Sequence, residues 1–479
     1  MKNRNLLHCG ALILLILFLK INNLYATSWH FTGPESINVN DFGAKADGIS
    51  DDAPAIRKAV EYATQNGVKK IIFGSGTYLL KSTKNSVYIP LFSNLAFIGQ
   101  GRHTILLQGS NSMVSEDPKI FFSRNFVENI KFEDFVIDQN GEKNLGTFVL
   151  KRSNIAIGAN HCSNIIINNI RFQNNAGRQT IVLGGNYKKK GARNIAISNC
   201  YFSNMGDGVA GNVIQNDHSS IYVIAEGFEC KNNIFRNPPL EKGQPIASAI
   251  ENHSSNATIM DNQIYNYKNV FVIGALVSEQ VNSIYSNNTG NSVLHLAEFW
   301  VNNFRLNNIT LSGNRVIQNL PAEAVSLSRN IRSPIGKINI LNNSFTYVGV
   351  RSKKYSYPAI SSKMIAELNI RGNEFSKIPS AVFQNQSINN FLQNIDFSEN
   401  TIIDCGNTET DNMIQNKTGV LLNGSSGGKL VLSKNRFKNS NASEFIKQGV
   451  IIDNYWKNMV ISDNEYLNIK NSLVNNKQK

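Results

Sequence analysis

The sequence predicts an all-β protein: a single-stranded, right-handed parallel β-helix with a capping α-helix at its N-terminal end. Three observations predict this fold. An Asn-anchored pattern recurs through most of the 479 residues, each copy alternates with the period of a strand, and the clearest helical pattern lies near the start. Hydrophobic residues make up 41% of the chain and charged residues 17%, which indicates a folded protein.

Residues 1–26 have the pattern of a secretory signal peptide. Lys2 and Arg4 precede an almost wholly apolar run from Leu6 to Leu19, and Leu24-Tyr25-Ala26 is an acceptable cleavage site. An uncleaved membrane anchor is the alternative, but the run is shorter than the ~20 residues of a spanning helix. We therefore expect a secreted or periplasmic protein that has no membrane contact after cleavage.

The predicted helix follows Asp51 and Asp52. Pro54 suits the first helical turn, Gly67 suits the end, and apolar residues recur at helical spacing between them: Ile56, Ala59, Val60 and Ala63. A β-helix needs such a cap because its first coil would otherwise expose an apolar cross-section and an open strand edge.

The repeat reads apolar-polar-apolar, then two polar residues that usually include Asn, then apolar again. Copies lie at residues 167–172, 197–202, 231–235, 260–264, 311–316, 341–345, 370–375, 397–402, 432–437 and 461–466. Asn tolerates the left-handed backbone, so it indicates a bend where its side chain can bond the backbone and stack on the Asn of the next coil. A propeller is the alternative, but its repeats run nearer ~45 residues, whereas these recur every ~26 to ~35.

A further short strand lies between successive anchors. These segments are 181–183, 249–251, 294–296, 325–327, 420–422 and 450–452. Two or three short strands per repeat with no intervening helix are typical of β-helix coils. We accordingly divide the chain into a signal peptide (1–26), a cap with the first coils (27–100) and further coils (101–479).

Residues 37–80 resemble the N-terminal signature of the pectate-lyase-like β-helix superfamily, which includes rhamnogalacturonase, polygalacturonase-like and tailspike-type proteins. The matching stretches are Ile37–Gly48, Asp51–Ile56, Ile71–Phe73 and Gly76–Tyr78. The resemblance implies the β-helix fold and a long face on which a sugar chain could lie. It does not imply one reaction, because the superfamily contains lyases, hydrolases, epimerases and non-catalytic binders.

Motifs of the individual catalytic groups are absent from the sequence. There is no Gly-His-Gly or Arg-Ile-Lys of the polygalacturonase type, no Arg-x-Pro-x-x-Arg of true pectate lyases and no Asp-Pro-His-Asp of alginate epimerases. We predict no cofactor and no metal site. Ca²⁺ bound by scattered acids remains an alternative without a motif to support it.

The formal net charge is +14 at pH 7, which suits an exported protein whose partner is an acidic polysaccharide. A coding bias towards Lys and Asn is the alternative explanation. The basic residues are scattered, and Lys188-Lys189-Lys190 is the one tight cluster, so we predict no nucleic-acid partner. The sequence leaves open whether the protein is a monomer or a trimer.

Cysteines outside the signal peptide number four: Cys162, Cys200, Cys230 and Cys405. Cys200 and Cys230 are nearest in repeat phase. They could form a disulfide in an exported protein, or all four could be buried free thiols.

The strongest candidate catalytic pair is Glu251 and His253. They are two residues apart on a predicted strand, so both side chains should point to the same side while Ile250 faces the core. A carboxylate beside an imidazole suits proton transfer. His295 alternates with Leu294 and Leu296 and should also point outward, with Glu298 at the end of that strand.

Asp207, in Gly206-Asp207-Gly208, is a further catalytic candidate because polygalacturonase-like enzymes, which the chain resembles, place carboxylates in such turns. Candidate substrate contacts complete the set: Asp217, His218, Glu298, Arg305 and Arg178. The alternatives are an ordinary tight turn at Asp207 and a solvated pair at Glu251 and His253.

These residues predict an exported lyase or glycoside hydrolase that acts on an anionic polysaccharide by carboxylate and histidine acid–base chemistry. A non-catalytic periplasmic β-helix that assists polysaccharide assembly or export is the second hypothesis, and a surface adhesin is the third. Converging acids with shifted pKa values would favour the enzyme, and a smooth face of Asn, Ser and Thr would favour the binder.

Overall fold

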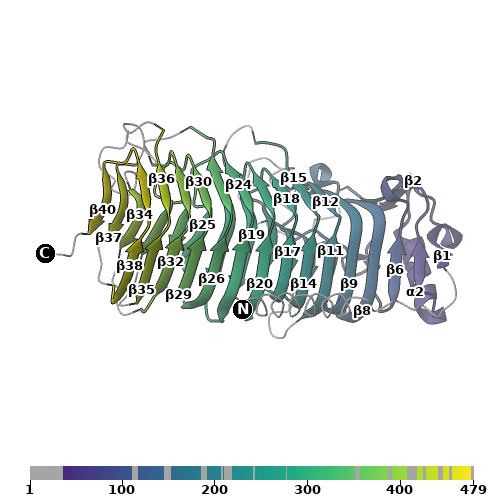
Figure 1. Ribbon diagram of the computed structural model, residues 1–479. Helices are drawn as coiled ribbons and strands as arrows, with labels where there is room; N and C mark the ends of the chain where they lie inside the picture. Colours follow the sequence, from purple (N-terminus) through teal and green to yellow (C-terminus); the bar gives the residue numbers. More distant parts are fainter. Residues whose placement is uncertain are drawn as a thin grey trace, which may run out of the picture.

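The chain coils into a long right-handed parallel β-helix, as the sequence predicts (Figure 1). This is a computed structural model. It describes residues 36–475 except for the following segments: 111–116, 145–152, 185–190, 207–208, 210–217, 241–242, 277, 351–356, 387–390, 407–417, 424–427, 441–445 and 453–455. The predicted signal peptide, Asp207, Asp217 and Lys188-Lys189-Lys190 therefore lie outside the described residues.

Each coil from β11 onward contributes one strand to each of three faces, and strands of one face pair in parallel from coil to coil. The first face contains β1 (Ser36–Asn38), β3 (Lys70–Ile72), β6 (Leu95–Ile98), β11 (Ala192–Ser198), β14 (Ala225–Lys231), β17 (Ser255–Met260), β20 (Gln280–Ser286), β23 (Leu306–Ser312), β26 (Ile335–Leu341), β29 (Ile365–Arg371), β32 (Asn394–Ser398), β35 (Lys429–Ser433) and β38 (Asn458–Ser462).

The second face holds shorter strands. They are β2 (Asp47–Asp51), β4 (Gly76–Leu80), β7 (Thr104–Gln108), β12 (Tyr201–Met205), β15 (Ile234–Arg236), β18 (Gln263–Tyr265), β21 (Thr289–Asn291), β24 (Arg315–Gln318), β27 (Ser344–Tyr347), β30 (Glu374–Ser376), β33 (Thr401–Ile403), β36 (Arg436–Lys438) and β39 (Glu465–Leu467).

The third face carries the candidate site. Its strands are β5 (Val87–Pro90), β10 (Gln179–Leu183), β13 (Ser219–Val223), β16 (Ser248–Asn252), β19 (Asn269–Ala275), β22 (His295–Val301), β25 (Val325–Ile331), β28 (Ile360–Ser362), β31 (Phe383–Gln386), β34 (Thr418–Asn423), β37 (Gln448–Ile452) and β40 (Asn471–Asn475). Two long strands, β8 (Lys119–Asp138) and β9 (Ile155–Asn175), bend through all three faces.

The predicted helix is α2 (Ala53–Asn66), at the N-terminal end of the solenoid (Figure 1). It begins after Asp52 and ends at Gly67, whose φ of 71° is left-handed, as a helix stop requires. The Asp52 carboxylate does not cap the helix but accepts hydrogen bonds from the backbone N–H groups of Lys45 and Ala46, at 2.7 and 3.2 Å. The apolar stripe of α2 is buried against the first coils.

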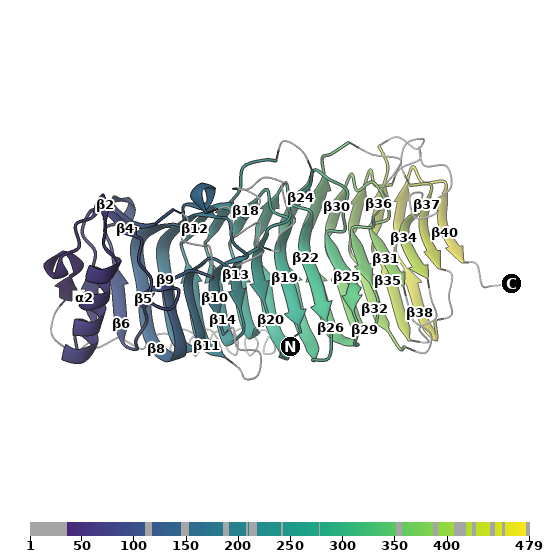
Figure 2. The ribbon, with the colours of Figure 1, turned by 180° about the vertical axis from the view of Figure 1, so that it is seen from behind.

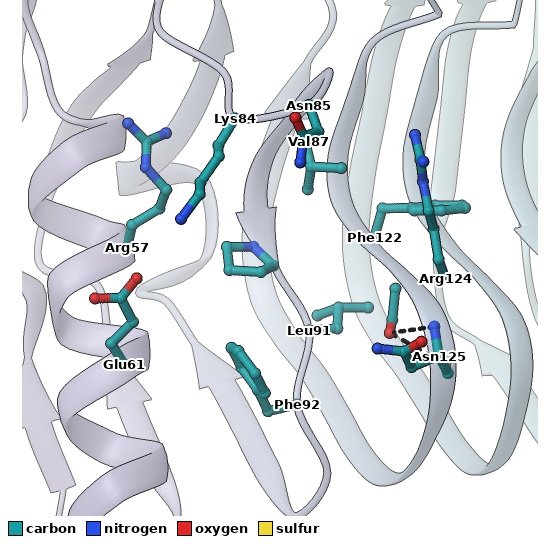
Figure 3. A pocket seen from close by; sticks show the side chains of 12 residues that line it. Arg57, Glu61, Lys84, Asn85, Val87, Leu91, Phe92, Phe122, Arg124 and Asn125 are labelled. Carbon is teal, nitrogen blue, oxygen red and sulfur yellow. Dashed lines mark hydrogen bonds between the residues drawn. The ribbon is translucent and has the colours of Figure 1, made fainter.

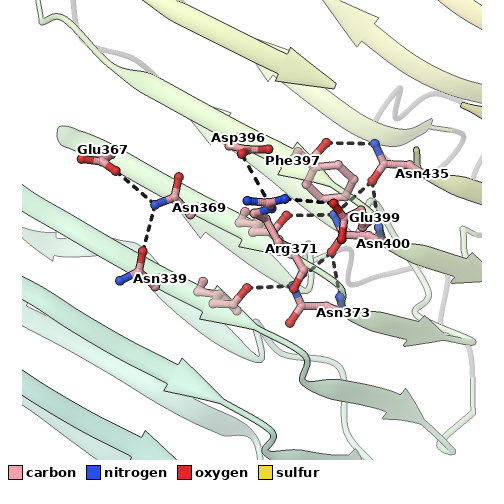
Figure 4. A network of polar contacts seen from close by, with 12 residues as sticks. Asn339, Glu367, Asn369, Arg371, Asn373, Asp396, Phe397, Glu399, Asn400 and Asn435 are labelled. Carbon is pink, nitrogen blue, oxygen red and sulfur yellow. Dashed lines mark hydrogen bonds and ion pairs between the residues drawn. The ribbon is translucent and has the colours of Figure 1, made fainter. Parts of the chain in front are cut away.

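The asparagines of the repeat form a continuous ladder between the first and second faces, which confirms the predicted stacking. Each side-chain Nδ2 donates to Oδ1 of the next asparagine at 2.9–3.0 Å. The members are Asn233, Asn262, Asn288, Asn314, Asn343, Asn373, Asn400, Asn435 and Asn464 (Figure 4 shows Asn373, Asn400 and Asn435). The residue before each has a left-handed φ, so the ladder turns the chain at every coil.

The interior is filled by ladders of like side chains. Phe172, Phe202 and Phe235 stack with ring centroids 4.8 and 4.5 Å apart, close to the strand spacing. Each fully buried side chain of this size contributes about 2 kcal/mol through burial. Because every coil adds to one continuous core, the solenoid is a rigid base for side chains on its outer faces.

The cysteines are free thiols. Cys162, Cys200, Cys230 and Cys405 are all buried and none is bonded to another, so the Cys200–Cys230 disulfide that the sequence left open does not form. Burial raises the pKa of the Cys200 thiol to about 12. These thiols therefore act as small apolar core residues.

Candidate functional site

The third face presents a column of outward side chains that runs from coil to coil. The strand register aligns Pro90, Phe122, Gly158, Val182, Tyr222, Glu251, Val272, Glu298, Ser326 and Ser361. We call this the site column. The strands that carry its middle part, among them β10, β13, β19 and β22, lie side by side across the front of Figure 2.

Glu251 and His253 point to the same outer side of the third face, as predicted. Ile250, between Ala249 and Glu251, is fully buried in the core. The Nε2 of His253 lies 3.0 Å from Oε1 of Glu251, and the Ser219 hydroxyl donates to Oε2 of Glu251 at 2.5 Å. The Glu251 side chain is 17% exposed and the His253 side chain only 1%.

The His253 ring is held by its neighbours on both adjacent coils. Tyr222, on β13, packs against it with ring centroids 5.1 Å apart, and Nδ1 lies 2.9 Å from the carbonyl oxygen of Gly274, on β19. A carbonyl oxygen only accepts, so the contact with Gly274 requires a proton on Nδ1 of His253. An ionised carboxylate also only accepts, so the contact between Nε2 and Glu251 requires a second proton between these two groups. The pair therefore holds one transferable proton.

Burial alone would raise the pKa of the Glu251 carboxyl, but the hydrogen bond and charge of His253, the Ser219 hydroxyl and the charge of Arg178 together lower it. The Glu251 carboxyl is therefore ionised at pH 7. Since His253 is buried, it can reach a substrate only through Glu251 and is a positioning residue. The solvated pair that the sequence left as an alternative is not what forms.

Glu298 is a second buried carboxylate on the site column, in the middle of β22 and not at the strand end as predicted. Its Oε2 accepts from Nζ of Lys268 and Nδ2 of Asn269, both at 3.2 Å, and its Oε1 accepts from Nδ2 of Asn330 at 3.3 Å. Burial would raise the pKa of this carboxyl, but the Lys268 charge lowers it below its usual value. Glu298 is therefore held as an anion.

His295 faces the outer side, as predicted, and only 5% of it is exposed. The strand bends so that Leu296 and Ala297 both enter the core, and the His295 Nδ1 lies 2.5 Å from the carbonyl oxygen of Glu323. Burial lowers the pKa of His295 to about 4, with the nearby Glu298 opposing that shift. The ring is neutral at pH 7 and lies next to the Glu298 carboxylate.

Glu251 and Glu298 are separated by one strand, β19, which contributes Val272 to the site column between them. Two strand spacings put their Cα atoms about 10 Å apart. Trp300 continues β22 beside them, opposite Gly274, and is 37% exposed. The site thus has two carboxylates with different hydrogen-bond partners. The apolar side chain of Val272 lies between them, and the Trp300 ring lies at the edge.

The remaining candidates divide into two groups. Arg178 lies near Glu251, since its charge contributes to the lowered pKa of that carboxyl. Arg305 is exposed at the corner before β23, and no contact joins it to either carboxylate in the described part of the chain. His218 is fully buried, with Nδ1 2.5 Å from the Gly177 carbonyl oxygen, so its position does not fit the substrate contact we expected.

Sequence reasoning missed the groups that hold the two carboxylates and form the rim: Ser219, Lys268, Asn269, Trp300 and Asn330. They come from different coils, and only strand alignment brings them together. Within the described ranges, no three His, Cys, Asp or Glu side chains gather as ligands for a metal ion. In those same ranges, no helix has the length and apolar character needed to cross a membrane.

Residues 36–272 match the family model described as rhamnogalacturonase A/epimerase, pectate lyase-like. The tailspike protein of E. coli bacteriophage HK620, solved in complex with a hexasaccharide, aligns with a TM-score of 0.61 at 15% identity, over 89% of this chain and 78% of the tailspike chain. This chain belongs to the pectate-lyase-like parallel β-helix superfamily. The A-module of a mannuronan C-5 epimerase of Azotobacter vinelandii has the same fold (TM-score 0.57, 14% identity, 89% of this chain and 98% of the module).

Two curated proteins match shorter segments of this chain than the family model does. The plasmin and fibronectin-binding protein A of Streptococcus pneumoniae (strain ATCC BAA-255 / R6) is 27% identical over 185 residues, which are 35% of this chain and 24% of that protein. An SPbeta prophage-derived uncharacterized protein of Bacillus subtilis (strain 168) is 33% identical over 100 residues, 20% of this chain and 15% of that protein. The matches thus span about a quarter or less of each relative.

Proposed function

We propose that the protein is an exported glycoside hydrolase that cleaves an anionic polysaccharide lying along the third face. The observation that carries this proposal is the pair of carboxylates on the site column, Glu251 and Glu298, each buried and held by its own set of partners. Acid–base hydrolysis of a glycosidic bond needs one group that delivers a proton and one ionised carboxylate that takes one. In this proposal the Glu251–His253 pair delivers the proton, and Glu298 is the ionised carboxylate.

Glu251 is the proton donor in this proposal. The proton that it shares with His253 passes to the glycosidic oxygen as the bond from that oxygen to the sugar carbon breaks. His253 then returns to the neutral form, which keeps its Nδ1 contact with Gly274. Ser219 and Tyr222 fix the pair in place, so little reorganisation is needed during the reaction.

Glu298 is the base. Lys268, Asn269 and Asn330 keep its carboxylate ionised, and it removes a proton from the water that attacks the sugar carbon. The intervening strand, which contributes Val272, separates the two side chains and favours the wider spacing of inverting enzymes, in which a water lies between the carboxyl groups.

An acidic substrate and export complete the proposal. The formal net charge of +14 favours a polyanion, and the pattern of residues 1–26 favours secretion or a periplasmic location. The tailspike relative was solved with an oligosaccharide and the epimerase relative is named for a polysaccharide substrate, which supports a glycan as the occupant of this face.

The experiment is digestion of polygalacturonate, alginate, hyaluronate and neutral controls with the purified protein, its Glu251→Gln variant and its Glu298→Gln variant. We expect new reducing ends without the absorbance of unsaturated uronides, and a loss of about 10²- to 10⁴-fold in each variant. Glu367→Gln is the matched control, since Glu367 pairs with Lys337 on the first face, and it should keep full activity. Unsaturated products would instead indicate a lyase, and full activity in both site variants would refute the assignment.

A second candidate is surface adhesion, which one observation favours: the relative from Streptococcus pneumoniae is named for binding plasmin and fibronectin. In that case the third face would bind a protein. Binding of plasmin and fibronectin to the immobilised protein, unaffected by Glu251→Gln and Glu298→Gln, would support adhesion, and no binding of either would oppose it.

A further inference from the structure

A cavity of about 490 Å³ lies between the capping helix α2 and the first coils, far from the carboxylate pair (Figure 3). Arg57 and Glu61 reach it from α2, Lys84 from the turn before β5, and Phe122 and Arg124 from β8. The lining residues Val87, Pro90 and Phe122 belong to β5 and β8, which pair on the third face.

The charges around this cavity favour an anion. Figure 3 shows Arg57 and Lys84 on one side and Arg124 on the other. The Arg57 guanidinium is fixed by donation to the carbonyl oxygens of Ser82 and Tyr88, at 2.8 and 3.0 Å, and among the described residues it forms no ion pair with a carboxylate. In the described part of the chain Lys84 and Arg124 form no ion pair. Glu61 is the one acid among the lining residues.

One part of the cavity wall is apolar. Val87, Pro90, Leu91 and Phe122 line it, and Phe92 leaves 37% of its surface exposed. A ligand that packs on the apolar lining residues and also pairs with the Arg and Lys side chains must be amphipathic. It needs a flat apolar side and an anionic substituent. A sugar ring that bears a carboxylate has both, because its C–H face can lie on an aromatic ring while its carboxylate pairs with Arg or Lys.

The cavity is continuous with the site column. Pro90 and Phe122, two of its lining residues, are the first members of that column, and the register leads through Gly158, Val182 and Tyr222 to Glu251. Four strand spacings separate Phe122 from Glu251, about 19 Å along the solenoid. A polymer of several sugar units spans this distance, and a short oligosaccharide bound at Glu251 does not.

We propose that this cavity is a distant subsite that holds a uronate sugar of the same polysaccharide chain whose cleavage occurs at Glu251 and Glu298. The inference rests on the proposed function for the identity of the chain. Lys84 and Arg124, on opposite sides of the cavity, each pair with an anionic group of the bound chain, and Phe92 supports a sugar ring. The subsite thereby sets a preference for long anionic chains over short ones.

The test compares Arg124→Gln, Lys84→Gln and Phe92→Ala with the unaltered protein on long polygalacturonate, alginate and hyaluronate, on their carboxyl-reduced forms and on short oligosaccharides. Lys58→Gln, which removes an exposed charge from the same helix outside the cavity, is the matched control. We expect each cavity variant to raise KM for the long acidic chain about tenfold while kcat and the KM for short oligosaccharides stay unchanged.

Binding of the long acidic polymer to the Glu251→Gln variant, followed by calorimetry, separates the two proposals. Binding that weakens about tenfold on adding Arg124→Gln, but not Lys58→Gln, supports the subsite even if no cleavage is ever detected. Cleavage that depends on Glu251, with KM and binding unaffected by all three cavity variants, overturns the subsite and leaves the hydrolase standing. Equal binding of acidic and carboxyl-reduced polymers also overturns it.

Discussion

The His253 ring lies directly over Gly274 of the next coil, and only a glycine leaves room for it. A Cβ atom at position 274 would stand 2.5 Å from Cε1 and 2.6 Å from Nδ1 of the ring. The absent side chain lets Nδ1 donate to the Gly274 carbonyl, so Nε2 faces Glu251. The position of the proposed proton donor therefore depends on a residue that carries no chemistry of its own.

Replacing Gly274 with alanine should displace His253 and lower kcat at least about tenfold, because Glu251 would lose the partner with which it shares its proton. Overpacking should also cost about 1–3 kcal/mol of unfolding free energy. Ile273→Val is the control, since Ile273 points into the core of the same strand and should cost about 1 kcal/mol without changing kcat. An active Gly274→Ala enzyme would show that the His253 contact is not needed.

The asparagine ladder should be a main source of stability. Asn314 donates to the Tyr285 carbonyl and to Asn343, each at 2.9 Å, and its oxygen accepts from the backbone N–H and Nδ2 of Asn288. Asn314→Ala leaves these buried groups unpaired, which should cost about 3 kcal/mol or more in urea denaturation. Asn339→Ala, a half-exposed position that bonds Thr310, should cost about 0.5 kcal/mol. Equal effects would contradict the ladder's role.

Stability should fall as the pH drops from about 6.5 to about 4. Burial lowers the pKa of His218 to about 4 from a usual 6.5, so in this window the unfolded chain binds a proton at this ring and the folded chain does not. The loss amounts to about 3 kcal/mol at the lower end. His295 adds to it in the same direction, because burial lowers its pKa to about 4 as well.

His218→Gln should flatten this dependence by about 1.4 kcal/mol per pH unit between the two values, measured as the unfolding free energy against pH. The lowered pKa values of Glu251 and Glu298 act at more acidic pH, where protonation of these carboxyls removes further stability. A variant whose slope equals that of the unaltered protein would mean that His218 is already protonated in the fold.

The four cysteines should be inert in the folded protein. Burial raises the pKa of the Cys162 and Cys200 thiols to about 12, so no thiolate is available to react. A thiol reagent should therefore modify all four only after unfolding, and a reductant should leave the melting temperature unchanged. A shift of that temperature on reduction would indicate a disulfide and contradict the free thiols.

The fold could be predicted because its determinants are local. Each ladder asparagine follows a left-handed residue, and Asp52, Pro54 and Gly67 define the helix within a short stretch. The Glu251–His253 pairing was likewise predictable from strand alternation. The burial of His253 was not, because Tyr222 and Gly274 lie on neighbouring coils.

The position of the second carboxylate, Glu298, could not be predicted from the sequence for the same reason. The turns between the third face and the next ladder asparagine differ in length from coil to coil, so the sequence alone does not align Glu298 with Glu251. Strand alternation predicted the outward direction of His295, but its burial depends on the Glu323 carbonyl, which lies far away in the sequence. The alternation itself breaks at Leu296 and Ala297, which both lie in the core. Alternation fails wherever a strand turns a corner of the solenoid.

The stereochemistry of the first product tests the central claim most directly. Proton NMR of polysaccharide digestion in its first minutes reports which anomer of the new reducing end forms before mutarotation. Two carboxylates on alternate strands, whose Cα atoms lie about 10 Å apart, predict inversion of configuration with Glu251 as acid and Glu298 as base, and loss of the signal in either Gln variant. Retention of configuration, or an unsaturated sugar in place of a reducing end, would contradict the account.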